Sequence, residues 1–333
     1  MTQTPQTQHS VEAEHWSRLQ ESGTVLGMRF LLWIYKLFGR FIFRLFLYPV
    51  MLFYMIRRGS ARRASQDFLD KHYQTYPQAW NQKPGLWHTL RHFLSFGDAI
   101  LDKLLAWSAH LSEDEFELLN PELTETLLGD QRGQLIIGTH LGNLEYCRGF
   151  MQRYMSKDIN VLVYDQHAAH FVKMMQQINA TSRVNVYQVD QLDLKTILLL
   201  KTKIDQGEWL FIAGDRVPVT LARDVSKQSD AKLEQKNTAK VDFLGHPAAF
   251  PIGPYMLANS LACPVKLMFS YRDKDIVKFD VVSFNQDDPI QLKRAQRQQQ
   301  LQGFAQDFAS QLERHCATVP YQWFNFYDFW NQA

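Results

Sequence analysis

The segment Leu135-Ile-Ile-Gly-Thr-His-Leu-Gly-Asn-Leu-Glu145 passes from a short apolar run into a stretch of helical character. Residues 135–137 predict a buried strand, Gly138 and Thr139 a turn, and the residues from Leu144 onward a helix. A strand followed directly by a helix is the repeating unit of an α/β sheet, and such sheets bind ligands at the carboxyl ends of their strands. His140 therefore stands where a functional group is expected.

His140 and Glu145 form an HX4E motif, which places an imidazole and a carboxylate at one strand end. An imidazole titrates near neutrality, and a carboxylate within hydrogen-bond reach would fix its tautomer and stabilise the imidazolium. The pair predicts a general base, His140, with Glu145 as its partner. The alternative is a capping or core histidine, with Glu145 only complementing the positive end of the helix dipole.

Short apolar runs alternate with helical stretches through the rest of the chain. Further strands are predicted at residues 160–164, 184–189, 209–213, 241–244, 265–271 and 276–284, and helices at 144–155, 168–179, 192–205, 254–261 and 292–316. Residues 64–121 read as helical, with helices at 86–96 and 99–110. The sequence thus predicts an α/β fold with a mostly parallel central sheet flanked by helices.

The composition sets limits on partners and compartment. The chain has 333 residues, of which 46% are hydrophobic and 13% aromatic, enough for one large domain with or without an appendage. The net charge of only +2 gives no reason to expect a nucleic-acid partner. The three cysteines are far apart and lack CxxC spacing, which argues against a disulfide framework or a zinc ribbon and favours a reducing compartment.

The region before residue 64 combines bulky apolar residues with arginine and lysine. Arg29, Lys36, Arg40 and Arg44 are spaced by seven, four and four, so that they share one stripe of a helix. This pattern predicts an amphipathic, membrane-associating helix, with a buried helix bearing paired arginines as the alternative. The longest uncharged stretch, 45–56, is shorter than the roughly twenty residues that a spanning helix needs.

Four further arginines at 57, 58, 62 and 63 would be attracted to anionic headgroups on the cytoplasmic side. We accordingly expect three parts: a polar tail at 1–24, a membrane-associating basic and apolar helical segment at 25–63, and a catalytic domain at 64–333. Membrane phospholipid is the expected partner of residues 25–63.

Two later motifs also follow predicted strands. In Ala213-Gly-Asp-Arg-Val-Pro218, Asp215 and Arg216 are placed to bind a phosphate or to polarise a carbonyl, or else only to pin the loop. The stretch 241–255 reads as a short strand, a turn and a helix entered through prolines. Its apolar residues Phe243, Phe250 and Ile252 are candidates for an acyl groove, with a place in the core as the alternative.

HxxxxE, then GDR at 214–216, then FLGHPAAFPIGP at 243–254, in this order, resemble the lysophospholipid acyltransferase superfamily, most closely the late acyltransferases of lipid A. The likeness extends along most of the chain to the ending WFNFYDFW at 323–330. It implies transfer of a fatty acyl group from acyl carrier protein, or from coenzyme A, to a hydroxyl of a lipid at the cytoplasmic face of the bacterial inner membrane. The resemblance also implies that His140 is the general base and Glu145 is its partner.

The resemblance has one departure. Many lipid A enzymes have an arginine early in the segment that here reads Val163-Tyr-Asp-Gln-His-Ala-Ala-His170, where this chain has Asp165 and Gln166. The GDR block and GMRFLLWIYKLFGR at 27–40 also resemble relatives encoded beside aryl-polyene or other glycolipid pathways. The lipid or glycolipid acceptor and the acyl chain therefore stay open.

Acyl transfer from a thioester needs one base and donors for a tetrahedral oxyanion, and no cofactor or metal. The backbone N–H groups of Gly142 and Asn143, helped by Arg216, are the predicted oxyanion donors. An acidic carrier protein would dock on basic residues, and the candidates are Lys201, Lys203, Arg294 and Arg297.

Two rival functions remain. His140, His167 and His170, with Glu145, would be the ligands of a metal-dependent hydrolase. The other rival is a membrane-binding protein without activity.

Overall fold

The computed structural model describes residues 33–107, 116–154, 157–163, 183–188, 193–216 and 237–330. The predicted tail 1–24, Arg29 and the helix predicted at 168–179 lie outside this range. The chain divides into two compact units, Met1–Val50 and Met51–Ala333.

An apolar helix, Trp33–Arg57, begins in the first unit and ends in the second. Its 25 residues are long and apolar enough to cross a membrane. The sequence placed the helix correctly but treated 45–56 as too short to span. The difference arises because the sequence argument counted only the uncharged stretch, whereas the helix also includes Lys36, Arg40 and Arg44.

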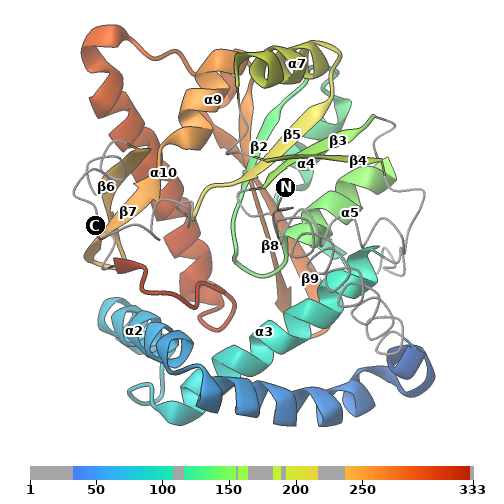
Figure 1. Ribbon diagram of the computed structural model, residues 1–333, viewed down its shortest axis with the longest axis vertical. Coiled ribbons are helices and arrows are strands. Elements are labelled where there is room, and N and C mark those ends of the chain that lie inside the picture. Colours follow the sequence, from blue (N-terminus) through green and yellow to red (C-terminus); the bar gives the residue numbers. More distant parts are fainter. Residues whose placement is uncertain are drawn as a thin grey trace, which may run out of the picture. The chain divides into compact units, whose positions relative to one another are not determined.

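The second unit is built on a seven-stranded sheet with the order β1-β9-β8-β2-β5-β3-β4 (Figure 1). Only β8 and β9 pair antiparallel, and every other neighbouring pair is parallel, as the sequence predicted. The strands are β1 Phe116–Leu118, β2 Leu135–Gly138, β3 Ile159–Val163, β4 Val184–Gln188, β5 Trp209–Ala213, β8 Val265–Asp273 and β9 Ile276–Phe284.

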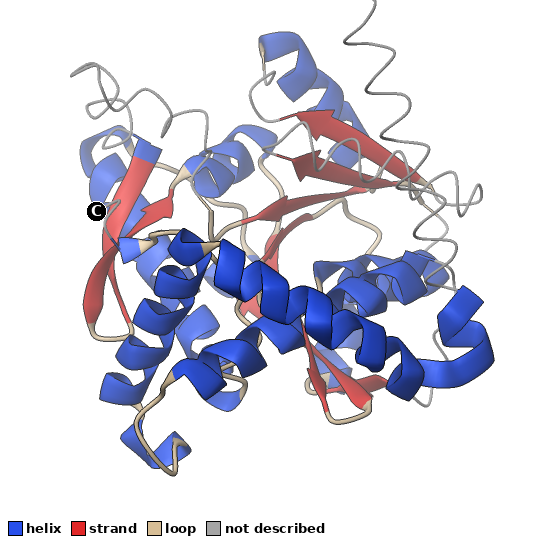
Figure 2. Ribbon diagram, turned by 60° about the horizontal axis from the view of Figure 1, so that its bottom comes forward, coloured by secondary structure: helices blue, strands red, loops and turns tan. Residues whose placement is uncertain are grey.

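Helices cover both faces of this sheet (Figure 2). Successive side chains of a strand point to opposite faces, so Leu135 and Ile137 enter one hydrophobic core while Ile136 enters the other. The described helices are α2 Gly59–Thr75, α3 Leu86–Trp107, α4 Pro121–Gly129, α5 Leu144–Tyr154, α7 Leu194–Asp205, α9 Gly253–Leu261 and α10 Arg297–Thr318. Gly97 does not interrupt α3, which is one helix where two were predicted.

A separate hairpin joins β6 Thr238–Phe243 to β7 His246–Pro251 and lies beside α10 (Figure 1). The sequence predicted only the first of these strands. Leu244 and Gly245 both have positive φ, 55° and 67°, which is the conformation that a two-residue hairpin turn requires. The helix predicted after it, at 254–261, is present as α9 Gly253–Leu261.

Candidate functional site

His140 and Asp215 meet because β2 and β5 are neighbouring parallel strands. Gly138 pairs with Ala213 at the carboxyl ends of the two strands, and the N–H of Gly214 donates to the carbonyl of Gly138 over 2.9 Å. A side chain at Gly214 would collide with the core, so this close approach needs glycine. The residues that follow each strand consequently leave the same edge of the sheet together.

Asp215 holds His140 at two points. Its Oδ1 lies 2.7 Å from Nδ1 of the ring, and its Oδ2 accepts from the backbone N–H of His140 over 2.8 Å. Oδ2 also accepts from the indole Nε1 of Trp323 over 3.0 Å. Because an ionised carboxylate only accepts hydrogen bonds, Nδ1 carries the ring proton and Nε2 is left as the proton acceptor. Asp215 is completely buried, whereas the His140 side chain keeps 31% of its surface exposed.

The surroundings fix the charge of both groups. Burial, followed by the nearby charge of Arg216, lowers the pKa of His140, and the opposite effect of Asp215 does not cancel this. The imidazole is thus neutral at neutral pH, as a base must be. Burial alone would raise the pKa of Asp215, but the contacts with His140 and the charge of Arg216 hold it below its ordinary value.

Glu145 does not hold the His140 ring, which corrects the prediction from the HX4E spacing. Its Oε2 accepts from Nε of Arg148 over 2.8 Å, and its Oε1 lies 3.6 Å from Nζ of Lys103. The position of Glu145 in the first turn of α5 directs it to cations of α5 and α3. The carboxylate that orients the ring is Asp215.

The backbone N–H groups of Gly142 and Asn143 are already used, which corrects their assignment as oxyanion donors. Gly142 donates to the carbonyl of Gln322 over 2.6 Å, and Asn143 donates to that of Ser270 over 3.1 Å. Gly142 has φ +60°, and a side chain there would strike the backbone at Ser270. These two residues shape the turn after His140 and offer no N–H to a substrate.

Of the predicted oxyanion donors, Arg216 is the one with N–H groups still available. Its Nε donates to Oδ1 of Asn325 and its Nη2 donates to the carbonyl of Phe324, both over 2.8 Å. A guanidinium has five N–H groups, and within the described part of the chain those on Nη1 have no hydrogen-bond partner. The fixed side chain thus presents unused donors near His140, whose pKa its charge lowers.

The segment 322–327, after α10, closes the site and was not predicted to take part in it. The N–H of Phe324 donates to the carbonyl of His140 over 3.0 Å, and Nδ2 of Asn325 donates to that of Asp215 over 3.4 Å. The aromatic ending at 323–330 was the available signal, but its place beside His140 and Asp215 is revealed only by these long-range contacts.

Helix α3 also holds the segment 322–327 in place. Nε2 of His92 lies 3.0 Å from the carbonyl of Trp323, and Nδ1 lies 2.9 Å from Oγ of Ser65. Burial lowers the pKa of His92 to about 4, so the ring stays neutral, donates through Nε2 and accepts through Nδ1. His92 therefore positions Trp323, which in turn holds Asp215.

Tyr327 is a further residue that the sequence did not single out. Its ring lies 6.0 Å from the guanidinium of Arg216, and its hydroxyl is buried with no hydrogen-bond partner in the described part of the chain. Burial, with the charge of Asp215, raises the pKa of Tyr327, so it stays a hydroxyl and a donor. A buried hydroxyl without a protein partner is costly unless a water molecule or a ligand supplies one.

The acyl-groove candidates belong to the core, which corrects that interpretation. Phe243 and Phe250 are completely buried and Ile252 nearly so, all in one hydrophobic cluster. The Phe243 ring lies 5.1 Å from that of Trp323, and Phe250 lies 5.4 Å from Phe329. They are placed this way because β6 and β7 turn these side chains towards α10 and the C-terminal segment.

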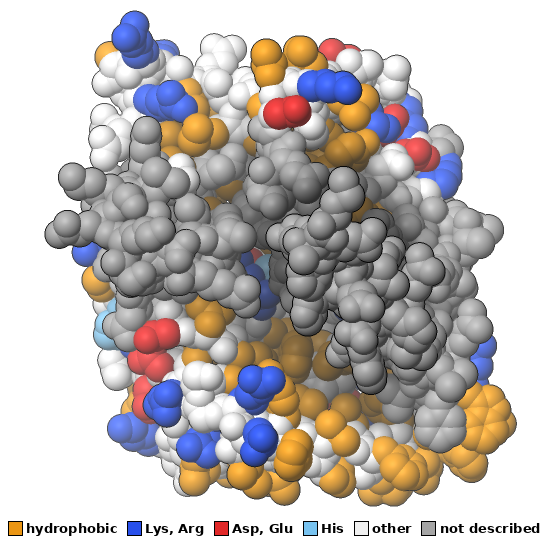
Figure 3. All heavy atoms as spheres, viewed as in Figure 1, with side chains coloured by type: hydrophobic (Ala, Val, Ile, Leu, Met, Phe, Trp, Pro, Cys, Tyr) orange, Lys and Arg blue, Asp and Glu red, His pale blue; other side chains and the backbone are white. Residues whose placement is uncertain are grey.

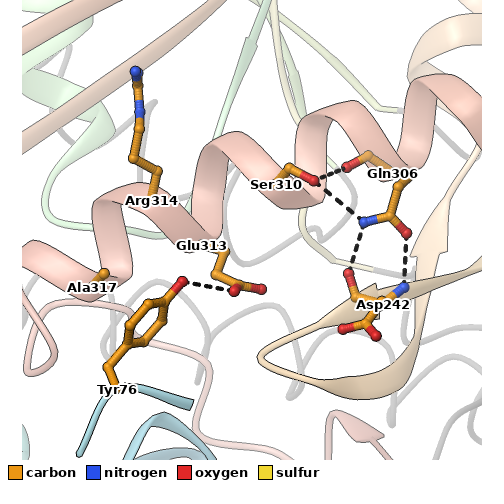
Figure 4. Close-up of a pocket in the computed structure, with 7 residues that line it drawn as sticks. All are labelled: Tyr76, Asp242, Gln306, Ser310, Glu313, Arg314 and Ala317. Carbon is orange, nitrogen blue, oxygen red and sulfur yellow. Dashed lines mark hydrogen bonds between the residues drawn. The ribbon is translucent and has the colours of Figure 1, made fainter. Parts of the chain in front are cut away.

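A hollow of about 430 Å³ lies along α10, but it is not the site (Figure 4). The Tyr76 hydroxyl donates to Glu313 over 2.7 Å, and the Gln306 side chain bonds both backbone groups of Asp242. His140 does not line it. Its lining residues are Tyr76, Asp242, Gln306, Ser310, Glu313, Arg314 and Ala317.

His167, His170, Asp165 and Gln166 lie outside the described residues. Within those that are described, no group of three or more His, Cys, Asp or Glu side chains is arranged to hold a metal ion. No family model and no curated protein matches the chain. Its function is therefore inferred from these residues and their geometry.

Proposed function

We propose that this chain is a membrane-associated acyltransferase that moves a fatty acyl group from a thioester to a hydroxyl of a lipid or glycolipid. The observation that carries the proposal is the His140–Asp215 pair, a neutral imidazole with Nδ1 held by a buried carboxylate and Nε2 left to take a proton. The order of the HX4E, GDR and FLGHPAAFPIGP motifs supports acyl transfer, and the helix Trp33–Arg57 supports membrane association.

The proposed reaction uses His140 twice. Nε2 takes the proton of the acceptor hydroxyl as its oxygen attacks the thioester carbonyl, and Asp215 stabilises the imidazolium. Collapse of the tetrahedral intermediate breaks the carbon–sulfur bond, and the imidazolium returns the proton to the departing thiolate. A thiol has a pKa of roughly 8.5, so the thiolate leaves readily and no acyl-enzyme is needed.

The oxyanion of that intermediate would be met by side chains. Arg216 offers its Nη1 donors and a full positive charge, and Tyr327 offers a neutral hydroxyl beside it. Both are buried or partly buried, where hydrogen bonds to a developing charge are strongest.

Tyr327→Phe removes only the hydroxyl, which has no partner to lose in the described part of the chain. We expect kcat to fall about tenfold, because loss of one transition-state hydrogen bond of about 1.4 kcal/mol slows a reaction by that factor. KM and Tm should not change. The matched control is Tyr76→Phe, whose hydroxyl donates to Glu313, and it should lower Tm and leave kcat unchanged. Unchanged kcat in Tyr327→Phe would remove Tyr327 from the site.

The dependence of kcat on pH should report His140. Because its pKa lies below the ordinary value of 6.5, kcat should be on its plateau at neutral pH and fall only as the pH drops below 6.5. Arg216→Gln removes a charge that lowers this pKa, so the acid limb should move to higher pH. Lys103 also lowers it, and Lys103→Gln should shift the limb in the same direction. An acid limb that stays in place in both variants contradicts the assignment.

The donor and the compartment follow from the resemblance and from charge. We propose acyl carrier protein, with coenzyme A as the other carrier, at the cytoplasmic face of the bacterial inner membrane. Of the docking candidates, Lys201 pairs with Asp205 and Lys203 with Glu208, whereas Arg294 and Arg297 are exposed near the start of α10. The last two are therefore the better candidates for an acidic partner.

Lipid mass spectrometry of a deletion strain against its parent tests the proposal. The deletion should lack one acylated lipid, which wild-type protein restores and His140→Ala does not. An unchanged lipid profile, together with no transfer by the purified protein from either thioester, would refute acyl transfer. Stoichiometric zinc or manganese with chelator-sensitive hydrolysis would favour the metal-dependent hydrolase.

A further inference from the structure

The start of α3 exposes two consecutive large apolar side chains. Leu86 is 62% exposed and Trp87 is 63% exposed, while His88 and Thr89, which follow them, are buried. The first turn of the helix thus buries its polar residues His88 and Thr89 and leaves Leu86 and Trp87 exposed to solvent. Exposed apolar clusters of this kind mark interaction surfaces, and tryptophan favours the boundary between water and lipid.

The end of the helix Trp33–Arg57 carries the same kind of surface within the same unit. Phe53 is 65% exposed and Ile56 is 63% exposed. The ring of Tyr54 lies 6.0 Å from that of Phe93, which joins this helix end to α3. The two apolar edges are therefore held together by packing.

Basic residues predominate beside these edges, and the two acidic residues of α2, Asp67 and Asp70, lie in the second half of that helix, where Asp67 pairs with Lys71. No Asp or Glu occurs at residues 51–66 or at residues 71–97. The exposed basic residues in these stretches are Arg57, Arg58, Arg63, Lys83 and Arg91. Over α2 and the start of α3, Lys and Arg side chains lie next to hydrophobic ones, with a few Asp or Glu side chains at the edge of this region (Figure 3). Apolar side chains with a basic border fit the surface of an anionic bilayer.

We infer that the catalytic unit has a membrane-contact surface of its own, formed by the start of α3 and residues 52–58, which places Leu86 and Trp87 among the headgroups of an anionic bilayer. The inference rests on the membrane association proposed above and not on acyl transfer. The surface continues an apolar helix that is long enough to cross a membrane, which favours lipid over a protein partner.

This contact would bring the candidate site to the lipid. One to two turns beyond Trp87 on α3, His92 holds the carbonyl of Trp323, and the Trp323 indole holds Asp215. The helix that meets the bilayer is thus the helix that supports the catalytic pair.

An environment-sensitive dye on a single introduced cysteine tests the inference. The native residues Cys147, Cys263 and Cys316 are buried, so Leu86→Cys in the full-length chain gives one accessible thiol in the described part of the chain, and the unsubstituted protein gives the background labelling. Leu194→Cys, on α7 and 73% exposed, is the matched control. Both proteins are reconstituted into vesicles of phosphatidylcholine with phosphatidylglycerol and titrated with aqueous iodide.

We expect blue-shifted emission and several-fold weaker iodide quenching at position 86 than at position 194. Lys83→Glu with Arg91→Glu should reduce that shielding. Equal quenching at the two positions, whether strong or weak, would overturn the inference. Because the readout is spectroscopic, it is unaffected if the proposed acyl transfer fails, and His140→Ala should give the same dye signal as the parent.

Discussion

Replacing His140 by alanine is expected to lower the turnover of acyl transfer by at least about 10²-fold, the loss typical of removing a general base. The structure gives the reason, because Nε2 of the neutral ring is the proton acceptor that the Asp215 contact leaves available. Association with membranes should not change, since the apolar helix Trp33–Arg57 is untouched. Initial rates with saturating thioester and acceptor measure the effect.

His246→Ala is the matched control for that variant. His246 lies on β7, its Nε2 contacts Gln74 over 3.2 Å, and it has no contact with Asp215. It should keep wild-type turnover. If His140→Ala also kept it, His140 would be no more than a turn residue.

The fold was predictable where local pattern decides the structure. The apolar runs at 209–213 and 276–284 match β5 and β9 residue for residue, because a buried strand bounded by turns is visible in the sequence. The strand β7 was missed because Gly245, Pro247 and Pro251 are typical of turns, so that the stretch was interpreted as a turn leading into a helix. The order of strands depends on pairing between distant segments and was not in the local pattern.

In the site, too, local pattern predicts the positions of single residues but not the pairing between distant segments. His140 and Asp215 were each predicted to follow the end of a strand, and each does, two residues after the last residue of β2 and of β5. Their pairing depends on β2 and β5 being neighbours, which no local pattern shows. Glu145 was chosen as the partner because it is near His140 in sequence, yet the helix start turns it towards Arg148. Trp323, which completes the set, comes from the far end of the chain.

Asp215→Asn should lower kcat by on the order of 10³- to 10⁴-fold, as when a carboxylate that fixes the tautomer of a catalytic histidine is replaced. Asp215 accepts three hydrogen bonds, from Nδ1 and the backbone N–H of His140 and from the indole of Trp323. An amide has one oxygen and one NH2 group, so it cannot accept all three. With NH2 facing the ring, Nδ1 must lose its proton, Nε2 gains it, and the base is lost.

Glu145→Gln separates the two carboxylates, because it changes the residue of the HX4E motif and leaves the Asp215 contacts intact. Its carboxylate binds Arg148, so we expect the variant to lose some stability in thermal unfolding and to keep most of its turnover.

Asp215 raises the pKa of His140, so whatever activity Asp215→Asn retains should have its acid limb at lower pH than the parent. A purely structural role for Asp215 would leave that limb in place. The reverse pattern, with Glu145→Gln inactive and Asp215→Asn active, would return the partner role to Glu145 and require a substrate-induced rotation of the His140 ring.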